Sequence, residues 1–186
     1  MEPGTAHEAR RRRPLPRARR ARRRQSGQAL VELALIAPVL IVLLLGVVEL
    51  GAALQARIAI INAAREGARL AGRGGVFSDA EVLQVVEGQS RSVDLAGSGS
   101  LILTTARCAG SCTWSSSTLS GSATSRLDTS SINALHAQLI ASEPDYLGEE
   151  SFVVLEIFYD HSSWTGLWGG TLSMYASATM PVSAPS

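Results

Sequence analysis

The stretch that decides the fold runs from residue 27 to residue 75 and reads GQALVELALIAPVLIVLLLGVVELGAALQARIAIINAAREGARLAGRGG. Residues 33 to 48 carry no charge, and Glu32 and Glu49 flank them. In a helix these two acids would be about 26 Å apart along the axis, close to the roughly 30 Å of a bilayer's hydrocarbon core. The pattern predicts a membrane-spanning helix with the two acids near its inner and outer edges.

A cleaved secretory signal is the alternative for the same apolar run, with candidate cleavage sites near Ala53 or Ala56. The apolar core is longer than the roughly 7 to 15 residues usual in such signals, and it has a Glu at each end. We therefore favour a retained anchor that crosses the membrane once.

The segment before the apolar run is strongly basic. All 17 basic residues of the chain are Arg, and ten of them fall between Arg10 and Arg24. A basic block can bind nucleic acid, but one that adjoins a membrane segment is better explained by the positive-inside rule. The prediction is a cytoplasmic leader over residues 1–27 that contacts anionic lipid and no nucleic acid. Without it the chain has seven Arg against fourteen acidic residues, a net charge of −7.

Glu32 needs an explanation, because a carboxylate in an apolar helix costs roughly 2.5 to 3.5 kcal/mol at mid-bilayer, and less near the interface. Gly27 lies five positions before it. If a peptidase cuts after Gly27, the new α-amino group of Gln28 lies one helical turn from Glu32 and can serve as its partner. Basic leader, Gly27, Gln28 and Glu32 together resemble the class III signal of type IV prepilins and pseudopilins.

A second motif follows the apolar run at Asn62–Arg69, which reads NAAREGAR. This motif and residues 27–35 occur in the same segment. Through both of them, roughly residues 20–72 resemble TadE-like proteins, which are the minor pseudopilins of the Tad/Flp pilus machinery. The resemblance implies a structural minor pseudopilin that a prepilin peptidase processes after Gly27. It also implies pilin-like subunits and pilus assembly proteins as partners, and a place in the cytoplasmic (inner) membrane with the C-terminal domain outside.

The helix is expected to continue past Glu49 to about Ala71, where Gly72, Gly74 and Gly75 break it. Small residues recur along one narrow face of this segment, a pattern that lets another element approach closely. They are Ala52, Ala56, Ala59, Ala63, Gly67 and Ala71. Two occupants of this face remain open: the helices of pilin-like neighbours, or the chain's own globular domain.

Residues 73–186 are expected to form an extracytoplasmic domain, after the leader and the helical region 28–72. Ser78 can cap a helix from Asp79 to about Gln89, with Glu81 one residue short of the capping-box position. Connections at 90–100 and 115–130 are rich in Ser and Gly. The other expected elements are strands at 101–108 and 112–119, a helix at 131–141, and strands at 152–159 and 172–182. The order predicts an α+β, pilin-like fold with an antiparallel sheet on helices.

Cys108 and Cys112 are the only cysteines. Outside the cytoplasm such a pair favours a disulfide across the turn at residues 109–111. Zinc would need two further ligands, and His136 and His161 are distant in sequence, so no metal is expected. No cofactor motif is present either.

An enzyme is not expected. Asp160, His161 and the pair Ser162-Ser163 are adjacent in sequence, which does not make a catalytic triad. Beside the pseudopilin role, the sequence leaves open a membrane-anchored extracytoplasmic binding domain. In that alternative the loop that contains Trp164 and Trp168 recognises a ligand or an envelope protein.

Overall fold

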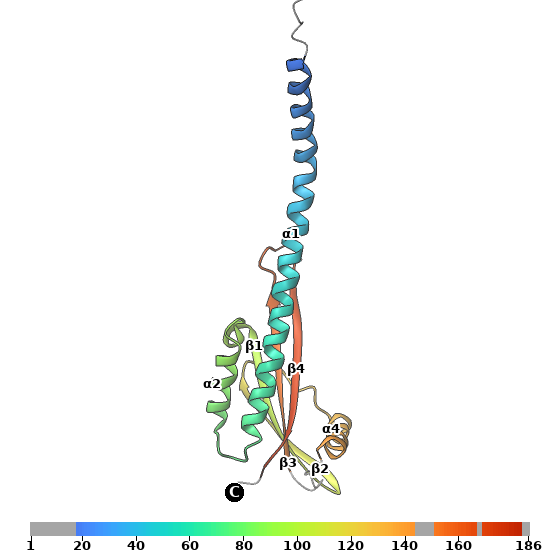
Figure 1. The fold of residues 1–186 in the computed structure, drawn as a ribbon. Coiled ribbons are helices and arrows are strands. Elements are labelled where there is room, and N and C mark those ends of the chain that lie inside the picture. The colour runs from blue at the N-terminus through green and yellow to red at the C-terminus, as the bar shows by residue number, and fades with distance from the viewer. Residues whose placement is uncertain (1–17, 144–150, 167–168, 184–186) are drawn as a thin grey trace, which may run out of the picture. The chain divides into compact units, whose positions relative to one another are not determined.

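The computed structural model describes residues 18–143, 151–166 and 169–183, with side chains from Gly27 onward. Trp168, one of the two tryptophans in the expected binding loop, lies outside these ranges. The chain divides into two compact units, Met1–Leu45 and Gly46–Ser186. Figure 1 shows the elements along the chain.

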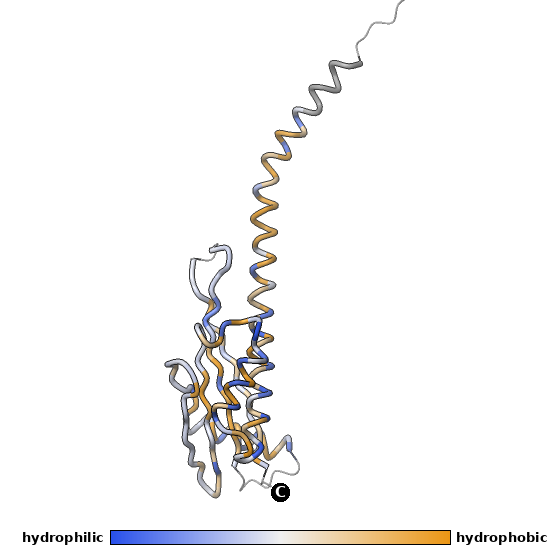
Figure 2. Tube along the Cα trace, turned by 90° about the vertical axis from the view of Figure 1, so that its left-hand side faces the viewer, coloured by the Kyte–Doolittle hydropathy of each residue, from blue (hydrophilic) through white to orange (hydrophobic). Residues whose placement is uncertain are grey.

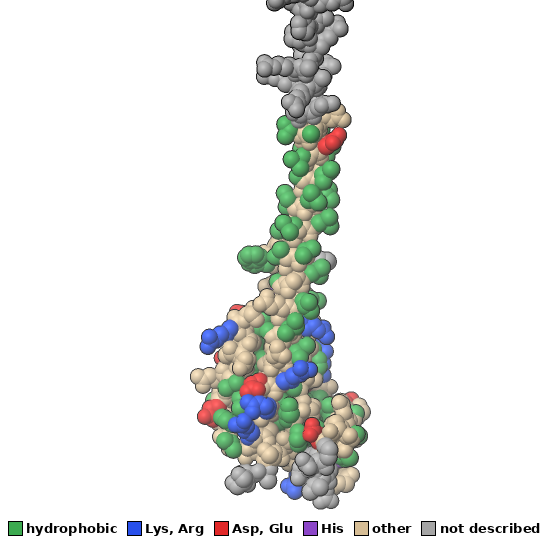
Figure 3. Space-filling model, viewed as in Figure 1, with side chains coloured by type: hydrophobic (Ala, Val, Ile, Leu, Met, Phe, Trp, Pro, Cys, Tyr) green, Lys and Arg blue, Asp and Glu red, His purple; other side chains and the backbone are tan. Residues whose placement is uncertain are grey.

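Helix α1, Ala18–Ala71, contains the predicted membrane segment and its continuation. It begins within the leader and passes Gly27 without interruption. Its part from Gly27 onward is long and apolar enough to cross a membrane. The large apolar side chains from Leu30 to Leu50 are 37–72% exposed, so much of their surface is left uncovered by the described chain. Figures 2 and 3 show these hydrophobic residues along the helix, whereas charged side chains gather over the second unit. Exposure of this kind is expected of an anchor that faces lipid.

The second unit contains one four-stranded sheet in the order β2-β1-β3-β4, with every neighbouring pair antiparallel. Its strands are β1 at Gly99–Ala109, β2 at Ser111–Ser120, β3 at Ser151–Ser162 and β4 at Thr171–Pro181. Helices α2 at Asp79–Gln89 and α4 at Thr129–Ser142 complete it, together with the short α3 at Leu95–Ser98. The predicted α+β class with an antiparallel sheet is confirmed, and each predicted strand and helix is present with ends shifted by a few residues.

One face of the sheet packs against α1 and α2 (Figure 1). Alternate residues of the strands point to the same face, so the core takes every second side chain. The sheet supplies Leu101, Leu103, Val153, Leu155, Ile157, Tyr159, Met174 and Ala176, and the helices supply Ile60, Ala63, Ala64, Ala68, Val82 and Val86. The C-terminal half of α1 is therefore part of the core of this unit.

The small-residue face of α1 is directed into this core. Ala56, Ala59, Ala63 and Gly67 are buried, and Ala52 and Ala71 are half-buried. A Cβ atom at Gly67 would lie 2.5 Å from Val86 Cγ2 and closer still to Leu155 Cδ2. Of the two occupants left open by the sequence, the structure places the chain's own sheet and α2 against this face.

The opposite face of the sheet is covered in part by α4. Ile132 and Leu139 of that helix pack with Ala106, Cys108, Phe152 and Val154. The N-cap of α4 is Asp128, whose carboxylate accepts from the Ser131 amide at 2.7 Å. The Ser131 hydroxyl and amide hold the pKa of Asp128 down at about 2. This cap, at the end of the Ser-rich connection, was not predicted.

Two sequence expectations need correction. Glu81 is at the N3 position and not one residue short of it, because Ser78 is the N-cap and Asp79 the first helical residue. Its carboxylate accepts from the Ser78 amide at 2.8 Å, and Ser78 Oγ accepts from the Glu81 amide at 3.4 Å, so the capping box is complete. The connection expected at 90–100 also contains helix α3, whose N-cap Asp94 accepts from the Gly97 amide at 3.0 Å.

Gly67→Ala tests the packing of α1. Alanine raises helix propensity by about 1 kcal/mol, but overpacking a tight core typically costs about 1 to 3 kcal/mol. We expect a net loss of stability, measured by chemical denaturation of the detergent-solubilised chain. Gly88→Ala is the control, since a Cβ at Gly88 in α2 meets no atom within 4 Å. It should be neutral or stabilising. A Gly67→Ala protein as stable as the Gly88→Ala protein would contradict the close approach.

Candidate functional site

The expected processing segment lies on α1, where Gly27 and Gln28 are adjacent and Glu32 follows Gln28 by one helical turn. All are exposed, and a Cβ at Gly27 would meet no atom within 4 Å. The Gln28 side-chain amide donates to Glu32 Oε1 at 3.3 Å. The residue after the expected cut and the acid therefore lie on the same side of the helix, as the sequence spacing requires.

Glu32 has no cationic partner among the described side chains. The ion pair found on the described part of α1 joins Glu66 to Arg69, within the last two turns of the helix. A single neutral amide at 3.3 Å compensates a carboxylate weakly compared with a charged donor. The geometry leaves room for an additional donor at Glu32.

Glu49, the other acid of the apolar run, is in a different environment. It is buried, with 4% of its surface exposed, although apolar residues on either side of it are exposed. Oε1 accepts from the Trp164 amide at 2.8 Å, and Oε2 accepts from the amide and hydroxyl of Thr165 at 3.4 and 3.3 Å. The carboxylate thus ties α1 to the β3–β4 connection, and these hydrogen bonds offset the cost of its burial.

Hydrogen bonds within the β3–β4 connection form a turn that directs its backbone amides toward Glu49. Ser163 Oγ accepts from the Gly166 amide at 3.0 Å, and the Gly166 carbonyl accepts from the Gly169 amide at 3.2 Å. Gly166 has φ +69° and Gly169 has φ +57°, backbone angles that other residues adopt only at a cost. From this turn the amides of Trp164 and Thr165 donate to the Glu49 carboxylate.

A cavity of about 290 Å³ lies beside this junction. Its lining includes Glu49 and Leu50 of α1, His161 and Ser163 at the end of β3, and Leu172 of β4. His161 Nε2 is buried and has no hydrogen-bond partner among the residues that the structure describes. Asp160, its neighbour in sequence, instead accepts from the Ser173 hydroxyl at 2.6 Å. A buried polar atom without a partner is uncommon, and here it marks a cavity that can hold water or a small polar group.

A second buried acid, Glu156, lies on the opposite face of the sheet and is fully buried. It accepts from the Ser125 hydroxyl, from the Arg126 amide at 3.0 Å and from the Tyr175 hydroxyl at 3.0 Å. The Arg126 guanidinium lies 4.6 Å from the Tyr175 ring centroid. Burial raises the pKa of Tyr175, so the phenol stays protonated and can donate. Glu156 thereby fixes the connection between β2 and α4 onto the sheet.

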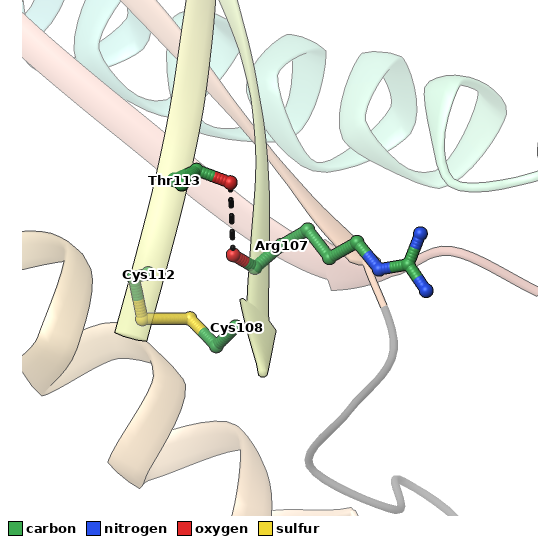
Figure 4. Close-up of a disulfide and its surroundings, with 4 residues drawn as sticks. All are labelled: Arg107, Cys108, Cys112 and Thr113. Carbon is green, nitrogen blue, oxygen red and sulfur yellow. Dashed lines mark hydrogen bonds between the residues drawn. A yellow bond between two sulfur atoms is a disulfide. The ribbon is translucent and has the colours of Figure 1, made fainter. Parts of the chain in front are cut away.

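The structure joins Cys108 and Cys112 in a disulfide across the β1–β2 turn (Figure 4), with Cα atoms 4.0 Å apart. Thr113 next to it donates to the Arg107 carbonyl at 3.5 Å. His136, which is distant from the cysteines in sequence, comes close to both sulfurs in space, with all possible ligand atoms within 4.8 Å of one another. This proximity was not expected from the sequence, and it arises because α4 packs over this end of the sheet. With the sulfurs bonded to each other, neither is a thiolate, the form that binds a metal.

Together these features define, within the described residues, one helix long and apolar enough to span a membrane and an α+β unit whose core includes the C-terminal part of that helix. Residues 27–69 match the family model described as TadE-like protein. This confirms the resemblance predicted from the two motifs and connects the segment with Tad pilus assembly. No curated protein and no solved structure matches the chain.

Sequence reasoning located Glu32 but missed the structural roles of Glu49 and Glu156. Glu49 was predicted to lie at the edge of the bilayer. Glu156 lies within a β-rich run, and no sequence motif around it predicts a buried hydrogen-bonding role. Their partners lie 115 and 30 residues away, respectively, so no local pattern pairs them.

Glu49→Ala should release the β3–β4 connection from α1. The amides of Trp164 and Thr165 lose an anionic acceptor, and we expect their hydrogen exchange to accelerate by roughly tenfold or more. Mass spectrometry or NMR of the detergent-solubilised chain measures this. Glu66→Ala is the matched control, because it removes an acid of the same helix that bonds Arg69 and not the loop. Equal exchange at Trp164 in both variants would show that the carboxylate does not hold the loop.

Proposed function

We propose that this protein is a structural minor pseudopilin of a Tad-type pilus assembly system, processed by a prepilin peptidase after Gly27. The observation that carries the proposal is the family match over residues 27–69, which begins at the expected cleavage residue. The exposed apolar run of α1 supports membrane anchorage. The leader would lie in the cytoplasm and the second unit outside the inner membrane, as the positive-inside rule requires.

Cleavage after Gly27 would change the electrostatics at the start of the anchor. It removes ten Arg and leaves a chain with net charge −7. A helix that begins at Gln28 has a free α-amino group and unbonded amides at its positive end. Glu32, one turn along and held by a weak amide contact, then gains the cationic partner that it lacks among the described side chains. The partner amine belongs to the same subunit or to a neighbouring pilin-like subunit.

The role requires no chemistry of the protein's own, and we propose that it is not an enzyme and uses no cofactor. In this function the second unit contributes its own core, which includes the C-terminal part of α1. The small-residue face of α1 is occupied by the sheet from Ala56 to Gly67, so contacts with pilin-like neighbours and assembly proteins would use other surfaces of the helix.

A membrane-anchored binding domain remains the second candidate. The cavity beside Glu49 favours it, because His161 Nε2 is buried there and the described part of the chain offers it no hydrogen-bond partner. Trp164, which is 87% exposed, offers an aromatic contact at the same junction. Such a domain needs no cleavage after Gly27, and this separates the two functions.

Gly27→Leu should block processing, since glycine leaves no side chain to obstruct the peptidase. The wild-type protein isolated from membranes should begin at Gln28, whereas the variant should retain its leader, as determined by N-terminal mass spectrometry. Gly46→Leu, at another glycine of α1 where a Cβ meets nothing within 4 Å, should be processed normally. An intact leader on the wild-type protein in cells with an active prepilin peptidase would refute the proposal.

Glu32→Gln tests the pairing with the α-amine. An amide is cheaper to desolvate than a charge, so insertion and cleavage should stay near normal. Co-purification with pilus components should fall, because the amide lacks the ionic attraction. Gln28→Ala is the control: it removes the observed side-chain contact but keeps the α-amine, and its assembly should persist. Equal recovery of wild-type and Glu32→Gln protein with pilus components would exclude the pairing.

A further inference from the structure

Four large apolar side chains are exposed around the Glu49 junction, and we call them the apolar rim: Leu50, Leu54, Trp164 and Leu172. Their exposed fractions are 62%, 61%, 87% and 54%. Single exposed apolar residues are common on soluble domains, but a cluster of them usually marks an interaction surface. The rim belongs to the second unit and is not used in its core.

Three observations show that the rim residues, which come from separate parts of the chain, lie together. The Trp164 amide donates to Glu49 at 2.8 Å, which holds Trp164 beside α1. Leu50 and Leu172 line the same cavity. Leu54 follows Leu50 at the next helical turn, so both lie on one side of α1. The rim is therefore formed by the fold and not by one segment alone.

The rim and the loop beside it are made of uncharged residues. The described residues of the connection, 163–166 and 169–170, are Ser, Trp, Thr and Gly, and Glu49 is buried beneath them. The next charged residue along α1 is the exposed Arg57, about one turn past Leu54 on the side away from the apolar run. Neutral polar groups with an exposed Trp are typical of a membrane–water interface, where the indole ring is half in lipid and half in water.

We propose that the apolar rim lies in the outer lipid interface, with Trp164 as its anchor, so that the second unit rests on the membrane surface. The argument for lipid as the occupant is continuity: Val47 and Val48 of the apolar run, 67% and 46% exposed, lead directly through Glu49 to Leu50. Lipid that surrounds the anchor necessarily approaches the next turn. The inference rests on the proposed membrane anchorage of α1.

Fluorescence of Trp164 tests the proposal in the full-length chain. The variant Trp114→Phe/Trp168→Phe leaves Trp164 as the only tryptophan, and it is reconstituted in phosphatidylethanolamine–phosphatidylglycerol nanodiscs, which expose both faces. We expect strong quenching by lipids brominated near the top of the acyl chain, weak quenching by iodide, and blue-shifted emission. The matched control, Trp164→Phe/Trp168→Phe, leaves Trp114 on β2 and should respond to iodide and not to brominated lipid.

Each other outcome overturns the inference. Quenching of Trp164 by iodide alone would place the loop in water, and shielding from both quenchers would place a protein partner on it, a second copy of the chain included. If the Trp114→Phe/Trp168→Phe variant misfolds, the contribution of Trp164 is obtained as a difference. It is the quenching of the wild-type protein minus the quenching of the Trp164→Phe variant. Carbonate extraction distinguishes a failure of the proposed membrane anchorage from a failure of the proposed rim position. A chain that carbonate releases from membranes would refute the anchorage of α1. A chain that stays in the membrane while Trp164 is in water would refute only the position of the rim in the lipid interface.

Discussion

Helix α1 approaches the sheet closely enough to share its core, because the side chains at the contact are small. At Ala56, Ala59, Ala63 and Gly67 the helix presents little more than its backbone, and Leu155 and Val86 fill the space. Dispersion contacts are short-ranged, so a slightly wider gap would forfeit much of this packing. The position of α2, which shares Val86 with the same contact, and the burial of the central strand β3 depend on this close approach.

The same helix meets two opposite demands. Before Glu49 its apolar side chains are exposed all around, as a lipid-facing segment requires. After Glu49 one side is small and buried while Arg57, Arg65 and Arg69 are exposed on the other. The transition from the exposed to the partly buried segment of α1 occurs at Glu49, whose carboxylate accepts hydrogen bonds from backbone amides of the β3–β4 connection. A buried carboxylate with such donors costs little, and it gives the end of the apolar run a defined position on the domain.

Much of this organisation could be predicted from the sequence, because it depends on local periodicity. The apolar run, the strands and the α+β class follow from patterns of a few residues. The occupant of the small-residue face could not be predicted, since an alanine stripe fits a helix or a sheet equally well. The Glu49 and Glu156 contacts and the approach of His136 to the cysteines are set by tertiary packing between distant segments. The cap at Ser78 and the first helical residue, Asp79, were predicted correctly, and only the position of Glu81 relative to the cap was miscounted.

The link between Glu49 and the β3–β4 connection has a mechanical consequence. A pull along α1 would, without this link, concentrate on the first buried turn and could peel the helix off the sheet one contact at a time. Because the carboxylate is hydrogen-bonded to the residues that follow β3, part of the load passes into that strand, which pairs with β1 over residues 151–159 and with β4 over residues 152–162. A strand loaded in this way resists in shear, with many hydrogen bonds sharing the force at once. Within the second unit, α1 is therefore held at two places, by the loop at Glu49 and by the sheet from Ala56 onward.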